Sequence, residues 1–108
     1  MSGAVKFDQG KPRMDLLPAD ALLAVATVLT YGAAKYGDRN WERGLAWGRM
    51  HGAALRHLAA WSQGEELDDG KDGSGLPHLT MAATNLLMLI ASTQRGIGAD
   101  DRTQLREP

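Results

Sequence analysis

Residues 52–85 bring several side chains that could bind a metal ion into one short stretch of chain. Two imidazoles flank the acidic segment 64–72, and carboxylates beside imidazoles are a common ligand set for a cation. Carboxylates with few histidines suit Mg or Mn better than Zn, so we predict Mg or Mn as the cofactor. The candidate metal ligands are His57, Glu65, Asp68 and His78, and the two histidines could instead position a metal-bound water.

The acidic segment resembles a calcium-binding EF-hand loop only in part. Asp68, Gly70 and Asp72 imitate the opening of such a loop. Its third position lacks an oxygen side chain, however, and Leu79 stands where the closing glutamate is required, which excludes that motif. What remains is a group of hard oxygen ligands that could share one divalent ion, or an acidic loop that only faces solvent.

The available side chains favour one kind of chemistry. The chain has no cysteine, no glycine-rich phosphate loop and no nucleophile elbow, so covalent catalysis lacks a candidate. Carboxylates, imidazoles and nearby cations are instead the parts needed for metal-assisted hydrolysis of a phosphoanhydride. The metal lowers the pKa of a bound water, and the cations stabilise the charge that develops on phosphate.

Three helices must position these residues. Apolar side chains recur at helical spacing, and Pro and Gly stand where helices start and stop. We predict helices at about residues 18–36, 49–63 and 77–94. Residues 1–17 read as an extended arm, either a mobile tail or a segment that supplies cations to phosphate. Residues 97–108 read as a mobile tail, and no strand pattern is present.

Length and composition bound the architecture. A chain of 108 residues is one domain by the usual prior, and a domain of this size buries only roughly two thirds of the surface that its unfolded chain exposes. The predicted fold is therefore all-α: a single domain over 1–108, a small bundle of three main helices with an ordered N-terminal arm. We expect a homo-oligomer, because a second copy can finish burying the apolar faces.

Charge and hydropathy exclude several classes of partner. The formal net charge of -1 argues against stable nucleic-acid binding, which needs a basic excess. The chain shows neither a signal peptide nor an apolar run long enough to span a bilayer, so we expect no membrane partner and a cytoplasmic location. The first half is mildly basic and segment 64–72 is acidic, a division that suits a polyanion carried together with a metal cation.

Four blocks of sequence, in order along the chain, resemble a known family. They are residues 6–18, residues 31–41, residues 56–61 together with Gly64, Glu65 and Asp68, and residues 74–79. In these blocks the chain is similar to the phage-associated, MazZ-type dATP/dGTP diphosphohydrolases, relatives of the all-α MazG-like nucleoside triphosphate pyrophosphohydrolases. The paired acidic helix motifs of MazG-like enzymes are absent, and an E-x-x-D is found at Glu65 to Asp68, where the predicted second helix ends. Residues 70–73 look like an insertion beside the site.

The resemblance implies a function for the predicted site. It implies an oligomeric all-α enzyme that uses Mg or Mn to cleave a purine deoxynucleoside triphosphate, dATP or dGTP, to its monophosphate and pyrophosphate. Such an enzyme would work in the cytoplasm of a phage-infected or prophage-carrying bacterial cell. On this hypothesis His57, Glu65 and His78 are catalytic. The residues that would bind substrate are Lys11, Arg13, Lys35, Tyr36, Arg39, Trp41, Arg56 and Asn85.

Several alternatives stay open on the sequence. Tyr36 or Trp41 could stack on the base, or the tryptophan could instead cap the hydrophobic core. Asn85, on an apolar helix, must bond either to another helix or to a ligand, because burying it unpaired would cost about 1–3 kcal/mol. The rival to an enzyme is a non-catalytic oligomeric module for nucleotide binding or assembly, in which the acidic loop only faces solvent.

Overall fold

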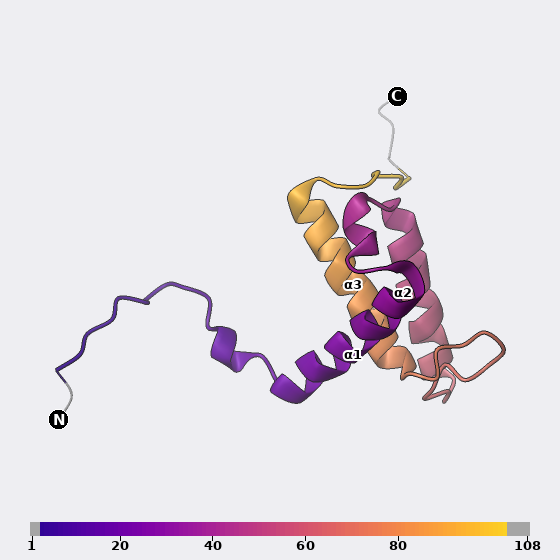
Figure 1. The fold of residues 1–108 in the computed structure, drawn as a ribbon, viewed down its shortest axis with the longest axis horizontal. Helices are drawn as coiled ribbons and strands as arrows, with labels where there is room; N and C mark the ends of the chain where they lie inside the picture. Colours follow the sequence, from indigo (N-terminus) through magenta and orange to yellow (C-terminus); the bar gives the residue numbers. More distant parts are fainter. Residues whose placement is uncertain (1–2, 104–108) are drawn as a thin grey trace.

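The computed structural model describes residues 3–103 as an all-helical fold (Figure 1). In chain order its elements are the 3₁₀ turn η1 (Met14–Leu16), helix α1 (Ala19–Tyr36), the 3₁₀ turn η2 (Asn40–Arg43), and helices α2 (Trp47–Ser62) and α3 (His78–Arg95). Helices α2 and α3 pack along each other, and α1 packs on α3. In the described part of the chain, β structure is limited to two isolated bridges. The predicted all-α fold with three main helices is confirmed.

Proline and glycine set the ends of α1 and α3, as the sequence indicated. Each helix starts directly after a proline in extended conformation, Pro18 with ψ of 120° and Pro77 with ψ of 132°. Each ends at a glycine with positive φ, Gly37 at 94° and Gly96 at 67°. Proline cannot donate a hydrogen bond, and glycine alone adopts positive φ without steric cost, so these boundaries are encoded locally.

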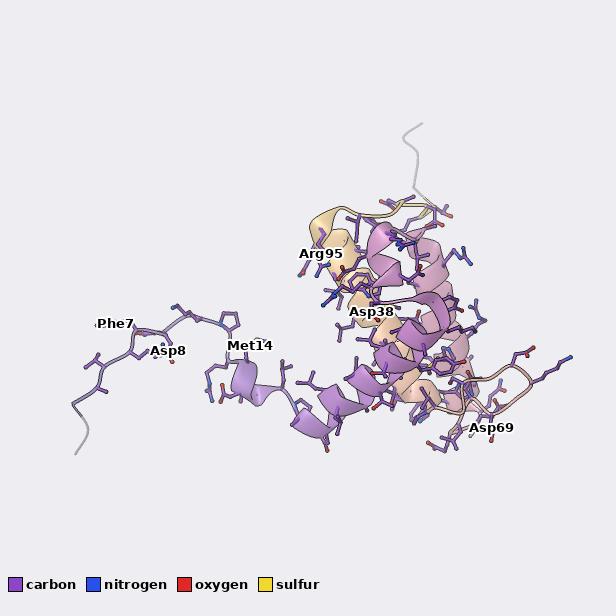
Figure 2. All side chains as sticks on the ribbon, in the orientation of Figure 1. Phe7, Asp8, Met14, Asp38, Asp69 and Arg95 are labelled. Atoms are coloured by element: carbon purple, nitrogen blue, oxygen red, sulfur yellow. The ribbon has the colours of Figure 1, made fainter. Side chains whose placement is uncertain are left out.

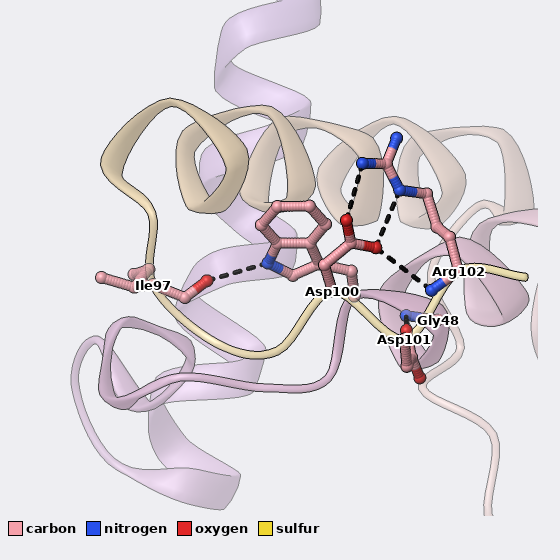
Figure 3. Close-up of polar contacts among 6 residues, drawn as sticks. Gly48, Ile97, Asp100, Asp101 and Arg102 are labelled. Atoms are coloured by element: carbon pink, nitrogen blue, oxygen red, sulfur yellow. Dashed lines mark hydrogen bonds and ion pairs between the residues drawn. The ribbon is translucent and has the colours of Figure 1, made fainter. Parts of the chain in front are cut away.

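The start of α2 depends on a distant segment, the chain that follows α3 (Figure 3). The helix begins at Trp47, before the predicted start near residue 49. The Trp47 backbone N–H donates to the Ala99 carbonyl at 2.9 Å, and its indole N–H donates to the Ile97 carbonyl at 2.8 Å. The Gly48 N–H donates to the Asp101 carboxylate at 2.7 Å. These bonds satisfy N–H groups that a helix start otherwise leaves unpaired.

Residues 97–102 are therefore an ordered part of the domain, which differs from the predicted mobile tail. Arg102 donates two side-chain hydrogen bonds to Asp100 and packs over the Trp47 ring, 5.4 Å from its centroid. The hydrogen bond from Arg102 lowers the pKa of Asp100 to about 2. The rest of the predicted tail, residues 104–108, lies outside the described residues.

Gly98 should be the least replaceable glycine of this contact. Its φ is 80°, and an added Cβ would collide with the Leu45 carbonyl. We expect Gly98→Ala to lower the free energy of unfolding by about 1–3 kcal/mol.

Gly32→Ala is the control: Gly32 lies inside α1 with open space at its Cβ position. Alanine there should be neutral or stabilise by up to about 1 kcal/mol, both measured by urea unfolding. Equal effects of the two variants would contradict this account.

The hydrophobic core of one chain is small. Among the described residues the buried apolar side chains are Val28, Met50, Ala54 and Ala82. Large apolar side chains remain exposed on both α1 and α3, with Leu23 at 70% and Ile90 at 56% of full exposure. Large apolar side chains gathered on a protein surface often mark an interaction site. None of the helices in residues 3–103 combines the length and apolar character of a membrane span.

The N-terminal arm, residues 3–17, leads away from the helices (Figures 1 and 2). It contains the turn η1, so it is not fully extended as predicted. Its large side chains stand in solvent, with Phe7 exposed to 87% and Met14 to 70%. The Cα radius of gyration is 17.7 Å, well above the value of about 13 Å typical of a compact domain of this size. The arm and the outer half of α1 cause the difference.

Candidate active site

An open cleft of about 800 Å³ lies between the C-terminal half of α1, the loop that contains η2, α2, the acidic loop and α3. Clefts of this size typically hold a small organic ligand. Eight of the twelve residues that the sequence nominated line it. They are Lys35, Tyr36, Arg39, Trp41, Arg56, His57, Asp68 and Asn85. The four that do not line it are Lys11, Arg13, Glu65 and His78.

Cations line the cleft from two sides. Lys35 and Arg39 come from the end of α1 and the start of η2, and Arg56 comes from α2. The pKa of Lys35 is raised, first by its hydrogen bond with Tyr36 and also by nearby charge, so the ammonium is charged at neutral pH. The structure adds Arg49, which the sequence hypothesis did not include. Arg49 and Arg56 are seven residues apart, which places them on one face of the helix. This spacing is the sequence signal that indicates Arg49 as a residue of the site.

The two candidate base-stacking rings differ in their surroundings. Tyr36 is 62% exposed, and the Lys35 ammonium lies 5.1 Å from its ring centroid. Trp41 is half-buried, and the Arg95 guanidinium packs 5.3 Å from its ring centroid while also pairing with Glu42. A cation therefore occupies one approach to each ring, and the rings differ mainly in how exposed they are. Tyr36 offers the more accessible face to a planar base.

His57 and His78 come from different helices and meet ring to ring. Their Nδ1 atoms lie 2.8 Å apart, so one imidazole donates a hydrogen bond and the other accepts it. His78 is buried, and its Nε2 lies 3.7 Å from the Glu65 carboxylate, within ion-pair range but too far for a hydrogen bond. The three residues form a row that runs from the cleft wall at His57 to the exposed Glu65.

The pKa of His57 is lowered, and desolvation by burial is the largest cause. The charges of His78 and Arg56 lower it further, while Asp68 acts in the opposite direction. Neutral imidazole therefore dominates at neutral pH, and a neutral imidazole can accept a proton. This is the protonation state that a general base requires.

The lowered pKa of His57 predicts a pH-dependent stability. The unfolded chain binds a proton at about pH 6.5, but the folded chain binds it only at lower pH. The contribution of the neutral His57 side chain to the free energy of unfolding is fully present above about pH 6.5. It is lost as the pH falls through the pKa that His57 has in the folded chain. We expect His57→Gln to flatten the fall in melting temperature between about pH 7 and pH 5. His51→Gln, a change at an exposed position on the same helix, should leave the slope as in wild type.

The acidic loop presents only some of its carboxylates to the cleft. Asp68 and Asp72 line it, while Asp69 points outward (Figure 2). Asp68 accepts hydrogen bonds from the Ser74 N–H at 3.2 Å and the Ser74 hydroxyl at 3.3 Å. Its carbonyl also accepts from the Gly75 N–H at 2.6 Å. These contacts fix the orientation of Asp68.

Residues 70–73, which looked like an insertion, form a tight turn that returns the chain to the cleft. The Gly73 N–H donates to the Gly70 carbonyl at 2.9 Å, and Asp72 has a φ of 65°. A Cβ at Gly73 would collide with the Asp68 carbonyl, so only glycine fits there. The turn brings Asp72 close enough for its charge to contribute to the raised pKa of Lys35. The sequence hypothesis had not included Asp72 in the site.

The four predicted metal ligands do not converge within this chain. Among residues 3–103 no three His, Asp or Glu side chains gather into a group that could hold a metal ion. The Nδ1 atoms of His57 and His78 bond to each other, and Asp68 is engaged by Ser74. The donor types suit Mg or Mn, but the described residues form no ready coordination site. Metal dependence stays a prediction.

Asn85 and the two arm cations are placed differently from what the sequence suggested. Asn85 lines the cleft, but its side-chain amide donates to the Met81 carbonyl one turn earlier on α3, rather than to another helix. Lys11 and Arg13 belong to the arm, which leads away from the helices (Figure 1), and neither residue lines the cleft of its own chain. Arg13 is held by Asp15 through two hydrogen bonds, at 2.7 and 3.0 Å.

Comparison with known proteins gives two matches. Residues 2–102 match the family model described as dATP/dGTP diphosphohydrolase, N-terminal. The chain is also similar to a dATP/dGTP diphosphohydrolase of Salmonella phage PMBT28, with 36% identity over 98 residues. The match covers 91% of this chain and 32% of the phage protein, so the chain spans about a third of that relative. No solved structure matches the chain.

Proposed function

Because the chain belongs to the dATP/dGTP diphosphohydrolase N-terminal family, we propose that it hydrolyses a purine deoxynucleoside triphosphate, dATP or dGTP. The products would be the monophosphate and pyrophosphate. Water attacks the α-phosphorus, the bond from that phosphorus to the bridging oxygen breaks, and pyrophosphate leaves. The observation that supports this proposal is the cleft, in which cations, an open aromatic ring, a neutral imidazole and two carboxylates face one space.

The cations and the tyrosine account for substrate binding. Lys35, Arg39 and Arg56 form an electropositive wall that suits the phosphates, and Arg49 adds a fourth cation. Tyr36 stacks on the purine, since its ring is the more accessible of the two candidates. A triphosphate spanning from this ring toward α2 would lie along the cation wall.

The histidine row accounts for proton transfer. His57 lines the cleft in neutral form and takes a proton from the attacking water. His78 bonds to His57 and fixes its ring orientation and tautomer. The carboxylate of Glu65, beside His78 Nε2, stabilises the positive charge that the pair gains.

A divalent cation enters this proposal as part of the substrate. No metal site is assembled among the described residues, so we propose that Mg or Mn arrives bound to the triphosphate. Asp68 and Asp72, which also line the cleft, would then attract this cation and offset the charge of the lysine and arginines around them. Removal of free divalent ions with a chelator should abolish turnover, and adding back Mg or Mn should restore it.

A homo-oligomer is also part of the proposal. The exposed apolar side chains of α1 and α3 are numerous for a soluble monomer, and a second copy would cover them. Light scattering on the purified protein should give a mass of at least two chains. A mass of one chain at all concentrations would refute the oligomer.

Pyrophosphate release from a panel of deoxynucleoside triphosphates, with Mg or Mn, tests the activity. Purine substrates should turn over, Glu65→Ala should lower the rate, and Glu66→Ala should leave it near wild type because that side chain lies outside the row. No turnover, or a Glu65→Ala rate equal to wild type, would refute the catalytic role.

The rival function is a non-catalytic nucleotide-binding or assembly module. The same panel distinguishes it when combined with a thermal-shift screen. A nucleotide that raises the melting temperature without forming product would identify a binding module. An unchanged melting temperature with every nucleotide, with or without metal, would leave an assembly role.

A further inference from the structure

We propose that the arm of one copy docks on a second copy of this chain and supplies Lys11 and Arg13 to the cleft of that copy. This inference rests on the proposed function and adds a partner residue set to the same site. Arm cations are useful to a triphosphate only if they reach the cleft, and the geometry decides which cleft they can reach.

The reach of the arm argues against its own cleft. The arm joins α1 at Pro18, while Lys35 lies seventeen residues along the helix, about 26 Å away. Five residues separate Pro18 from Arg13, and a fully stretched chain of that length spans at most about 18 Å. Doubling back would also require η1 to unwind. The main chain of Arg13 would still fall short of Lys35 by about 8 Å, and Lys11 would reach Lys35 only with all seven residues to Pro18 fully stretched along the helix, about 25 Å.

The arm has a defined shape although it stands away from its own helices. The Lys11 N–H donates to the Asp8 carbonyl at 3.1 Å, and the Leu17 N–H donates to the Met14 carbonyl at 3.2 Å. Phe7, Met14 and Leu16 are exposed to 87%, 70% and 70%. A shaped segment that presents large apolar side chains to water is stabilised when a partner surface covers them.

The charges of the arm and the acidic loop are complementary. Residues 3–17 carry three cations against two carboxylates, while residues 64–72 carry five carboxylates against one lysine. Within one chain the two segments lie at opposite ends of the molecule (Figure 1). In a pair of copies related by a two-fold axis, each arm can meet the acidic loop of the other copy, which closes the assembly. This complementarity identifies a second copy as the occupant of the surface beside the cleft.

The ion pair within the arm leaves Arg13 able to bind phosphate. Asp15 accepts from two of the five N–H groups of the Arg13 guanidinium and holds the group in one orientation. The remaining N–H groups can donate to a phosphate oxygen. Lys11 follows a turn at Gly10, whose φ is 83°, and its ammonium is exposed. Both cations are thus presented outward from the arm.

Complementation between two defective variants tests the inference. One variant carries Lys11→Ala with Arg13→Ala, and the other carries Glu65→Ala. Each alone should lose most of the pyrophosphate-releasing activity. The two are unfolded together in urea at equal amounts and refolded, with wild type and each variant treated in the same way. Two different affinity tags, pulled down in sequence, establish whether mixed assemblies form.

Arm exchange predicts that activity returns to about one quarter of wild type. One site in four then combines a cleft that has Glu65 with a partner arm that has Lys11 and Arg13. A mixture no more active than the separate variants, with mixed assemblies present, would overturn the inference. So would the absence of mixed assemblies, or full activity in the arm variant. Inactive wild type would instead refute the proposed function, so the two failures are distinguishable. Circular dichroism on each variant checks that the exposed substitutions leave the fold intact.

Discussion

Replacing Asp68 with asparagine is expected to lower kcat/KM for deoxynucleoside triphosphate hydrolysis by about 100-fold or more. Asp68 lines the cleft and is the carboxylate whose orientation is fixed, by two hydrogen bonds from Ser74. Its charge would act on the cation that accompanies the triphosphate. A pair of unit charges about 4 Å apart near a protein surface interacts by about 4 kcal/mol, against about 1 kcal/mol in bulk water.

Asparagine keeps the size of the side chain and one acceptor oxygen for Ser74, so the change removes mainly the charge. Asp69→Asn is the matched control, because it makes the same change of net charge on the next residue, which is exposed and outside the cleft. That variant should stay within about twofold of wild type, since exposed charges are screened. Equal losses in the two variants would show that the overall charge of the loop matters and that Asp68 has no specific role.

Replacing Arg56 with alanine is the second change with a large expected effect. Arg56 projects from α2 into the cleft beside His57 and is placed to bind phosphate. A hydrogen bond to a charged group contributes about 1.5–3 kcal/mol, so kcat/KM should fall by about 10- to 150-fold. The loss should shrink at high salt, because the charge of Arg56 is then screened in the wild type as well.

The control for Arg56 is Arg43→Ala. Arg43 is an exposed cation at the end of η2 and lies outside the cleft. Its removal should change steady-state kinetics by less than about twofold. The charge of Arg56 lowers the pKa of His57, so the Arg56 variant should have a higher His57 pKa. The acid limb of its pH–rate profile should therefore move to higher pH. A profile identical to that of wild type would contradict the placement of the two residues beside each other.

Much of the fold could be predicted from the sequence because its signals are local. Apolar residues at helical spacing, Pro18 and Pro77 at helix starts, and Gly37 and Gly96 at helix ends determine α1 and α3 within the length of each helix. The start of α2 could not be predicted in this way. Its first N–H groups are satisfied by residues about fifty positions later in the chain, so local sequence patterns do not reveal the helix start.

The chemical composition of the site was also determined by the sequence, which supplied the cations, aromatic rings, imidazoles and carboxylates. Only the tertiary structure decided which of them meet. The packing of α2 on α3 brings His57 against His78, twenty-one residues apart, and the turn at 70–73 directs Asp68 and Asp72 into the cleft while Asp69 faces out. The direction of α1 carries the arm away from the other helices, and no described residue of the arm lines the cleft. These outcomes depend on contacts between distant segments, and helical periodicity carries no information about such contacts.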